Sequence, residues 1–235
     1  MTSVTPQSSS FFVRWGSLLC LGLIYCFISI SSYAQESITV AVASSLYSDM
    51  QQQVKIFEKS HDASIRLVAG STGRLYNQIQ QGAPFDAFIA ADAIHPALLL
   101  KQGKAISEYA VGNGYLGLML GKELVGDLSG LMQPNIKHIA IANPDVAPFG
   151  LAAKKSLEEQ KVWETLKPKF VYAQNALQSA MMVQKGLVDA GFIPVRENQA
   201  VIAVITYHGV LLTNNSLAKS WLKSISPQNM VLQRP

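Results

Sequence analysis

The chain has 235 residues, of which 49% are hydrophobic and 14% are charged, and its formal net charge is +4. This composition excludes an intrinsically disordered chain and suits one or two globular lobes. The basic residues are dispersed, without a basic run that contains interleaved aromatic residues, so we expect no nucleic-acid partner.

The first 34 residues have the pattern of a secretory signal peptide. Arg14 is the only charged residue among them, and it precedes the apolar stretch from Trp15 to Ile30. Ser32 and Ala34 are small residues, placed as a cleavage site requires. An uncleaved membrane anchor is the alternative, but the apolar stretch is shorter than the roughly 20 residues that a membrane-spanning helix needs. We therefore expect residues 1–34 to be a signal peptide that is removed after Ala34.

Both cysteines of the chain, Cys20 and Cys26, lie in this leader. Apolar residues follow each of them, which argues against a lipoprotein. The mature chain would then contain no cysteine, which excludes disulfides, thiol catalysis and cysteine-ligated metals. At about 200 residues, it is long enough to bury a core without such cross-links.

Short apolar runs in the mature chain predict strands, because turn residues bound them and several are rich in β-branched residues. The predicted strands are Ile38–Ala43, Ile65–Ala69, Ala87–Ala90, Tyr115–Leu120, Ile139–Ala142, Phe170–Ala173, Val188–Ile193 and a last apolar stretch, Ala200–Leu212.

Segments with helical periodicity lie between these runs. The predicted helices are Ser48–Lys59, Arg74–Gln81, Ile94–Gln102, Gly150–Gln160, Ala176–Lys185 and Leu217–Ser224. The alternation of strands and helices predicts an α/β fold with largely parallel sheets. The segment Gly112–Gly114 is where we expect the chain to cross to a second lobe, with a return near Ile193–Pro194.

Ligands of parallel sheets bind at the carboxyl ends of the strands, so the turns there hold the candidate functional residues. The first two predicted strands each run into a turn rich in hydroxyl groups, Ser44-Ser45-Leu46 and Gly70-Ser71-Thr72-Gly73. A helix start offers unpaired N–H groups and a positive dipole end, and added hydroxyl groups make it suitable for an oxyanion. The alternative for each turn is that its serine only caps the following helix.

Two further turns also follow the carboxyl end of a predicted strand and precede a predicted helix. The turn Asn143–Gly150 leads into a helix through Pro148, and it leaves Phe149 and Gly150 as candidate backbone donors. The turn Gln174-Asn175-Ala176 precedes another helix, with Asn175 as a natural N-cap. Four such turns together point to an anion site more strongly than any one of them does.

Enzyme sites have weaker support. No Gly-x-Ser-x-Gly motif surrounds Ser45 or Ser71, so a secreted serine hydrolase is only an alternative. We expect Asp92 to cap the helix that begins at Ile94. The histidines lack the spacing of a metal site, and they are His61, His95, His138 and His208.

Several of these segments, in this order, make the mature chain resemble the periplasmic molybdate-binding proteins that supply molybdate ABC transporters. The Gly-Ala-Pro-x-Asp motif that continues to Ala91-Asp92 is the most specific part of the resemblance. The segments are Ala43–Leu46, Gly70–Leu75, Gln81–Asp92, Ile141–Pro144 with Pro148–Gly150, and Asp189–Phe192.

The resemblance implies a two-lobed periplasmic-binding-protein fold of the class II type, with the ligand cleft between the lobes. One lobe would comprise residues 36–112 and 196–235, and the other residues 113–195. The implied protein is a monomer in the periplasm without a cofactor or enzymatic activity. It would bind molybdate or tungstate and deliver it to a membrane permease, and a binding protein for sulfate or another oxyanion is the alternative.

The family's ligand contacts are hydroxyl and backbone N–H groups, so molybdenum is bound only as its oxyanion, through oxygen atoms. Carried to matching positions, the implied contacts are Ser45, Thr72 with Ser71 beside it, Phe149 and Ala176. Some family members add a tyrosine hydroxyl, but this chain has Pro194 there, and its carboxyl-terminal region is short. A site made of donors alone suits a fully ionised oxyanion, which only accepts hydrogen bonds.

Overall fold

A single mixed sheet of nine strands runs through residues 35–225, the part of the chain that the computed structural model describes. The signal-peptide prediction for residues 1–34 lies outside the described residues. The strand order is β2-β1-β3-β9-β4-β8-β6-β7, and β5 pairs with β4. None of the helices in residues 35–225 combines the length and the apolar character of a membrane span.

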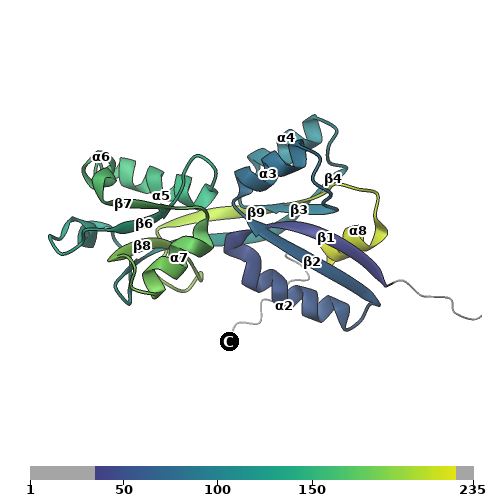
Figure 1. Cartoon of the computed structure of the whole chain (residues 1–235), viewed down its shortest axis with the longest axis horizontal. Helices are drawn as coiled ribbons and strands as arrows, with labels where there is room; N and C mark the ends of the chain where they lie inside the picture. The colour runs from purple at the N-terminus through teal and green to yellow at the C-terminus, as the bar shows by residue number, and fades with distance from the viewer. Residues whose placement is uncertain (1–34, 226–235) are drawn as a thin grey trace, which may run out of the picture. The chain divides into compact units, whose positions relative to one another are not determined.

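The first lobe is built on three parallel strands, with β1 between β2 and β3. Helices α2 and α8 cover one face of these strands, and α3 and α4 cover the other (Figure 1). Its strands are β1 (Glu36–Ala43), β2 (Ala63–Gly70) and β3 (Ala87–Ala90), and its helices are η1 (Ser44–Leu46), α2 (Tyr47–Glu58), α3 (Thr72–Gln80), α4 (Ile94–Lys101) and α8 (Ser216–Ser224).

The alternating side chains of β1 explain why helices cover both faces. Val40 and Val42 belong to the same hydrophobic cluster as residues of α2 and α8. Ala41, which points to the opposite face, belongs to a second cluster with residues of α3 and α4. A strand buried on both sides reads as a continuous apolar run, as the sequence of β1 does.

The second lobe repeats this arrangement on a smaller scale, with β6 pairing in parallel with both β7 and β8. Helix α5 packs its buried residues into the cluster that contains Ile139 and Ile141, while α7 packs against Ala140. Its elements are β5 (Glu123–Val125), η2 (Ser129–Met132), β6 (Ile139–Ala142), α5 (Pro148–Glu159), α6 (Trp163–Leu166), η3 (Lys167–Lys169), β7 (Phe170–Ala173), α7 (Ala176–Gln184) and β8 (Ala190–Val195).

Two long antiparallel strands, β4 (Ser107–Leu120) and β9 (Ala203–Leu211), connect the lobes. Strand β9 pairs with β3 in the first lobe and β4 pairs with β8 in the second. The α/β class and the two-lobed fold are as predicted from the sequence. The sheet is less parallel than predicted, because the two connecting strands run antiparallel to each other and to their neighbours.

Most predicted elements occur within a few residues of their expected bounds, and β3, β6 and β7 have the bounds predicted for them. The main difference is β4, of which only the second half, Tyr115–Leu120, was predicted. Its first half begins at Ser107 and pairs with β9 up to Leu211, a partner distant in sequence. The lobe boundaries at residues 112/113 and 195/196 stay a prediction, because one continuous sheet passes through both lobes.

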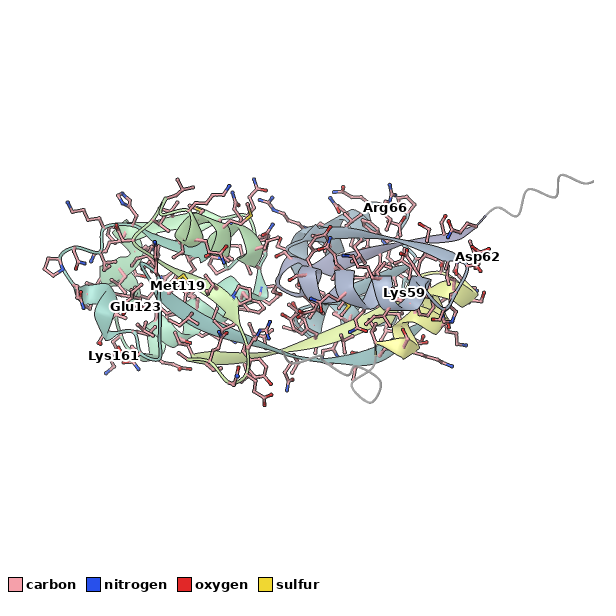
Figure 2. All side chains as sticks on the ribbon, turned by 90° about the horizontal axis from the view of Figure 1, so that it is seen from below. Lys59, Asp62, Arg66, Met119, Glu123 and Lys161 are labelled. Atoms are coloured by element: carbon pink, nitrogen blue, oxygen red, sulfur yellow. The ribbon has the colours of Figure 1, made fainter. Side chains whose placement is uncertain are left out.

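Charged side chains are spread over both lobes. In Figure 2, Lys59, Asp62 and Arg66 lie on the first lobe, while Glu123 and Lys161 lie on the second. All five side chains are exposed. This mixed surface agrees with the dispersed charge of the sequence.

Candidate anion-binding site

A recess with about 190 Å³ of empty space lies where turns of the two lobes meet. The recess is too small for a drug-sized ligand and suits a small ion. All five residues predicted to bind a ligand line it. The lining residues are Ala43, Ser44, Ser45, Gly70, Ser71, Thr72, Ala91, Ala147, Pro148, Phe149 and Ala176.

Ser45 enters the recess from the turn that follows β1. Its Oγ atom accepts a hydrogen bond of 2.9 Å from the Oη atom of Tyr207, which lies on β9. The prediction that Ser44 or Ser45 caps a helix is wrong, because the N-cap residues of η1 and α2 are Ala43 and Leu46. Since Ser45 accepts its bond from Tyr207, its own proton is left to donate elsewhere.

Thr72 is the first residue of α3 and is fully buried. Its Oγ1 atom accepts a hydrogen bond of 3.0 Å from the backbone N–H of Ala91. As with Ser45, the protein supplies a donor to the hydroxyl oxygen and leaves the hydroxyl proton free for a ligand.

Ser71 precedes Thr72 and is 3% exposed. It is the N-cap residue of α3, but its side chain makes no capping hydrogen bond. Its buried Oγ atom has no hydrogen-bond partner in the structure. A buried hydroxyl without a partner is costly, so Ser71 is a candidate for binding a ligand in the recess.

The second lobe contributes the start of α5, which follows β6 after a short turn. Phe149 is the second residue of this helix, so its N–H group has no acceptor within the helix. Gly150 allows the helix start to lie against the end of β6, since a Cβ atom there would be 1.9 Å from the carbonyl oxygen of Ala142. Only glycine fits this approach.

The start of α7 supplies the fourth side of the recess. Asn175 is its N-cap, as predicted, and its Oδ1 atom accepts a hydrogen bond of 2.9 Å from the N–H of Gln178. Ala176, the first residue of the helix, is 4% exposed and has no acceptor for its N–H within the helix. Capping and ligand binding are therefore compatible here, because they use different N–H groups.

Hydrogen-bond donors dominate the chemistry of the recess. Among the described residues, those that line it include no Asp, Glu, His, Lys or Arg. Asp145, the nearest candidate acceptor in the predicted turns, is exposed and does not line the recess. Hydroxyl protons and the positive ends of helix dipoles can stabilise an anion without a cationic side chain. Such a site favours an ionised oxyanion over one that carries a proton of its own.

The two lobes touch beside the recess. The N–H of Gly73 on α3 donates a hydrogen bond of 2.9 Å to the carbonyl oxygen of Val146, in the turn before α5. The Nη1 atom of Arg74 donates a bond of 3.3 Å to Oε1 of Gln174. Arg74 therefore contacts the second lobe at the surface and contributes no charge to the lining of the recess.

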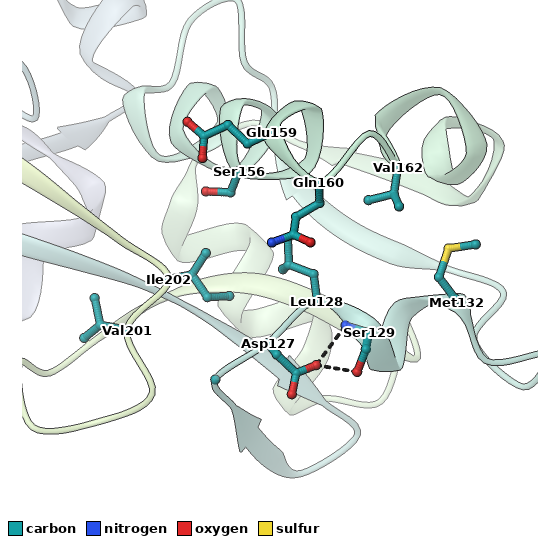
Figure 3. A pocket seen from close by; sticks show the side chains of 11 residues that line it. Asp127, Leu128, Ser129, Met132, Ser156, Glu159, Gln160, Val162, Val201 and Ile202 are labelled. Atoms are coloured by element: carbon teal, nitrogen blue, oxygen red, sulfur yellow. Dashed lines mark hydrogen bonds between the residues drawn. The ribbon is translucent and has the colours of Figure 1, made fainter.

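A larger hollow on the second lobe, with about 870 Å³ of empty space, is a less suitable anion site (Figure 3). Asp127 and Glu159 line it, and both carry negative charge. Hydrogen bonds from the Ser129 hydroxyl and N–H lower the pKa of Asp127, which keeps this carboxylate ionised. The carboxylates would repel an oxyanion.

The structure gives no support for a catalytic serine. Tyr207 is the hydrogen-bond partner of Ser45, and Ser71 has none, so neither serine is paired with a histidine in residues 35–225. The same residues contain no group of three His, Cys, Asp or Glu side chains that could hold a metal ion. The prediction that Asp92 is the N-cap of α4 is wrong, because the N-cap residue is Ala93; Asp92 lies one residue earlier, and its Oδ1 atom accepts the N–H of His95 at 2.9 Å.

Tyr207 was not predicted as a site residue, yet it supports Ser45 from a strand 162 residues further along the chain. Pro194, where the sequence predicted a missing donor, lies in β8 opposite Leu116 of β4 and is not among the residues that line the recess. No local motif marks Tyr207, since its position follows from the pairing of β9 with β3 and β4.

Comparisons with known proteins agree on one family. A family model described as bacterial extracellular solute-binding protein matches residues 38–213. The molybdate-binding protein ModA of Azotobacter vinelandii is 34% identical over 180 residues, which cover 75% of this chain and 69% of that protein. ModA of Rhodobacter capsulatus is 30% identical over 163 residues, covering 68% of this chain and 65% of that protein.

A solved structure supports the fold assignment. The periplasmic molybdate-binding protein of Azotobacter vinelandii is similar to this structure with a TM-score of 0.73 at 25% identity. The similarity covers 82% of this chain and 94% of that one.

Proposed function

Since the chain belongs to the bacterial extracellular solute-binding protein family, among the relatives of ModA, we propose that it captures molybdate or tungstate for an ABC importer. The observation that carries this proposal is the recess, where four buried or half-buried hydroxyl side chains meet the starts of α5 and α7 without an ionisable side chain. Such a recess offers hydrogen-bond donors to a tetrahedral dianion, and it requires no hydrogen-bond donor from the dianion.

The proposed cycle begins with an open cleft and ends with the ligand enclosed. Ser45, Ser71 and Thr72 would bind the anion from the first lobe, and the N–H groups of Phe149 and Ala176 would bind it from the second. Closure would bring together the surfaces of the two lobes that touch in this structure, at the bonds of Gly73 to Val146 and of Arg74 to Gln174. The closed form would then dock on the membrane permease. The protein would work as a periplasmic monomer, exported by its signal peptide, without a cofactor or a catalytic step.

Calorimetric titration of the mature protein with molybdate, tungstate, sulfate and phosphate tests the proposal. We expect tight binding of molybdate and tungstate, weaker binding of sulfate and the weakest binding of phosphate, which carries at least one proton near neutral pH. Ligand at about 100 times its dissociation constant should stabilise the folded state by about 2.7 kcal/mol, measurable as a rise in melting temperature. Preference for sulfate would support the alternative oxyanion, and no binding of any of the four would contradict the proposal.

A further inference from the structure

Tyr207 links the connecting strand β9 to Ser45 in the recess. It lies on β9 opposite Gly112 of β4, and from His208 onward β9 also pairs with β3. Tyr207 is therefore the last residue of β9 before this strand joins the sheet of the first lobe. From there its Oη atom reaches Ser45 at 2.9 Å, although Tyr207 does not itself line the recess.

The tyrosine ring is held by close packing. Tyr207 is 3% exposed, and its ring lies directly over Gly114 of β4. A Cβ atom at Gly114 would be 2.5 Å from the Oη atom and 2.6 Å from two ring carbons. Glycine at this position thus leaves room for the ring, and the two connecting strands together fix the direction of the phenol group.

The chemical state of the phenol group follows from its surroundings. Burial raises the pKa of Tyr207 far above its ordinary value, and the opposing effect of the hydrogen bond with Ser45 is smaller. The phenol therefore stays protonated and acts as a donor to Ser45. A hydroxyl that accepts a hydrogen bond is polarised and becomes a stronger donor itself. The Ser45 hydroxyl is therefore a stronger hydrogen-bond donor to a partner in the recess.

We propose that Tyr207 is a positioning residue for the ligand: by donating to Ser45 Oγ it orients the Ser45 hydroxyl as a donor into the recess and links it to the connecting strand β9. This inference rests on the proposed function, because it assumes that an oxyanion binds at Ser45. It adds a residue that touches no ligand, and it accounts for a buried phenol that would otherwise have only a packing role.

A double-mutant cycle tests the inference, using Tyr207→Phe, Ser45→Ala and the combination of both. Phenylalanine keeps the ring that packs on Gly114, so the variant is expected to fold, and its melting temperature without ligand checks this. The matched control is Tyr109→Phe, which removes a phenol on β4 that accepts a bond of 3.2 Å from Ser107, outside the recess lining.

Tyr207→Phe should weaken molybdate binding roughly 3- to 10-fold, the effect of one ordinary hydrogen bond. In the Ser45→Ala background, the same change should have no further effect, because Tyr207 acts through the serine hydroxyl. Tyr109→Phe should bind as the wild type does. Unchanged binding by Tyr207→Phe, or an equal loss with and without Ser45, would overturn the inference.

Titration of the wild type separates this inference from the proposed function. The cycle is measured with whichever of molybdate, tungstate, sulfate or phosphate binds the wild type most tightly. A wild type that binds while the two changes act independently refutes the role of Tyr207 alone. A wild type that binds none of the four anions refutes both proposals.

Discussion

Replacing Thr72 with valine removes one hydroxyl group and keeps the branched shape of the side chain. The hydroxyl has two separate roles in the structure. Its oxygen accepts the N–H of Ala91 at 3.0 Å, and its proton is available to the recess. The variant Thr72→Val therefore tests both roles at once, and the two roles affect different measurements.

The expected loss of stability comes from Ala91, which is 2% exposed. Its N–H would be buried without an acceptor in Thr72→Val, at a cost of about 1–3 kcal/mol. For a chain of this size, that corresponds to a fall in melting temperature of roughly 2–10 °C.

The expected loss of affinity comes from the bond to the anion. A hydrogen bond to a charged group contributes about 1.5–3 kcal/mol, so the dissociation constant for molybdate should rise roughly 10- to 150-fold. Thr72→Ser is the matched control, since it keeps the hydroxyl and loses one buried methyl group. We expect it to bind within about threefold of the wild type and to lose about 1 kcal/mol of stability.

Calorimetric titration with molybdate and thermal unfolding without ligand measure the two effects separately. If Thr72→Val is less stable but binds molybdate as well as the wild type, Thr72 serves only to hold Ala91. That result would refute the assignment of its proton to the ligand. Loss of binding in Thr72→Ser to the same extent as in Thr72→Val would also refute it, because the hydroxyl is then not the cause.

Two further predictions concern a free hydroxyl and a surface carboxylate. Ser71→Ala should weaken molybdate binding about tenfold but leave the ligand-free stability unchanged or higher, because the Ser71 hydroxyl has no protein partner; a clear loss of stability in denaturant unfolding would contradict this. Asp189→Asn should be destabilising at pH 7, because Oδ2 of Asp189 accepts the N–H groups of His138 and Lys137 at 2.8 Å. These bonds lower the pKa of Asp189 below 3.8, so their stabilisation is complete above that pH and is lost as the pH falls through the lowered pKa. Urea unfolding should show a smaller difference from the wild type at pH 3 than at pH 7, and an equal difference would refute the pKa argument.

The strands that run through buried cores could be predicted from sequence because their pattern is local. Ala87–Ala90 and Ile139–Ala142 are continuous apolar runs between turn residues, and the structure places β3 and β6 there. The first half of β4 could not be found in this way. It contains Gly112 and Gly114, and its pairing partner on β9 is distant in sequence.

The features of the candidate site also separate into those that are local in sequence and those that depend on the tertiary structure. The four turns could be recognised from the sequence, because a strand end, a hydroxyl or small residue and a helix start are all local features. That these turns surround one recess depends on the tertiary structure, which brings Thr72 and Ala176 together from different lobes. The structure alone decided that Tyr207 supports Ser45 and that Ala91 supports Thr72, because those bonds join residues that only the folded sheet makes neighbours. The local sequence pattern thus identifies the hydrogen-bond donors of the site, and the tertiary packing of the sheet determines how their hydroxyl groups are oriented.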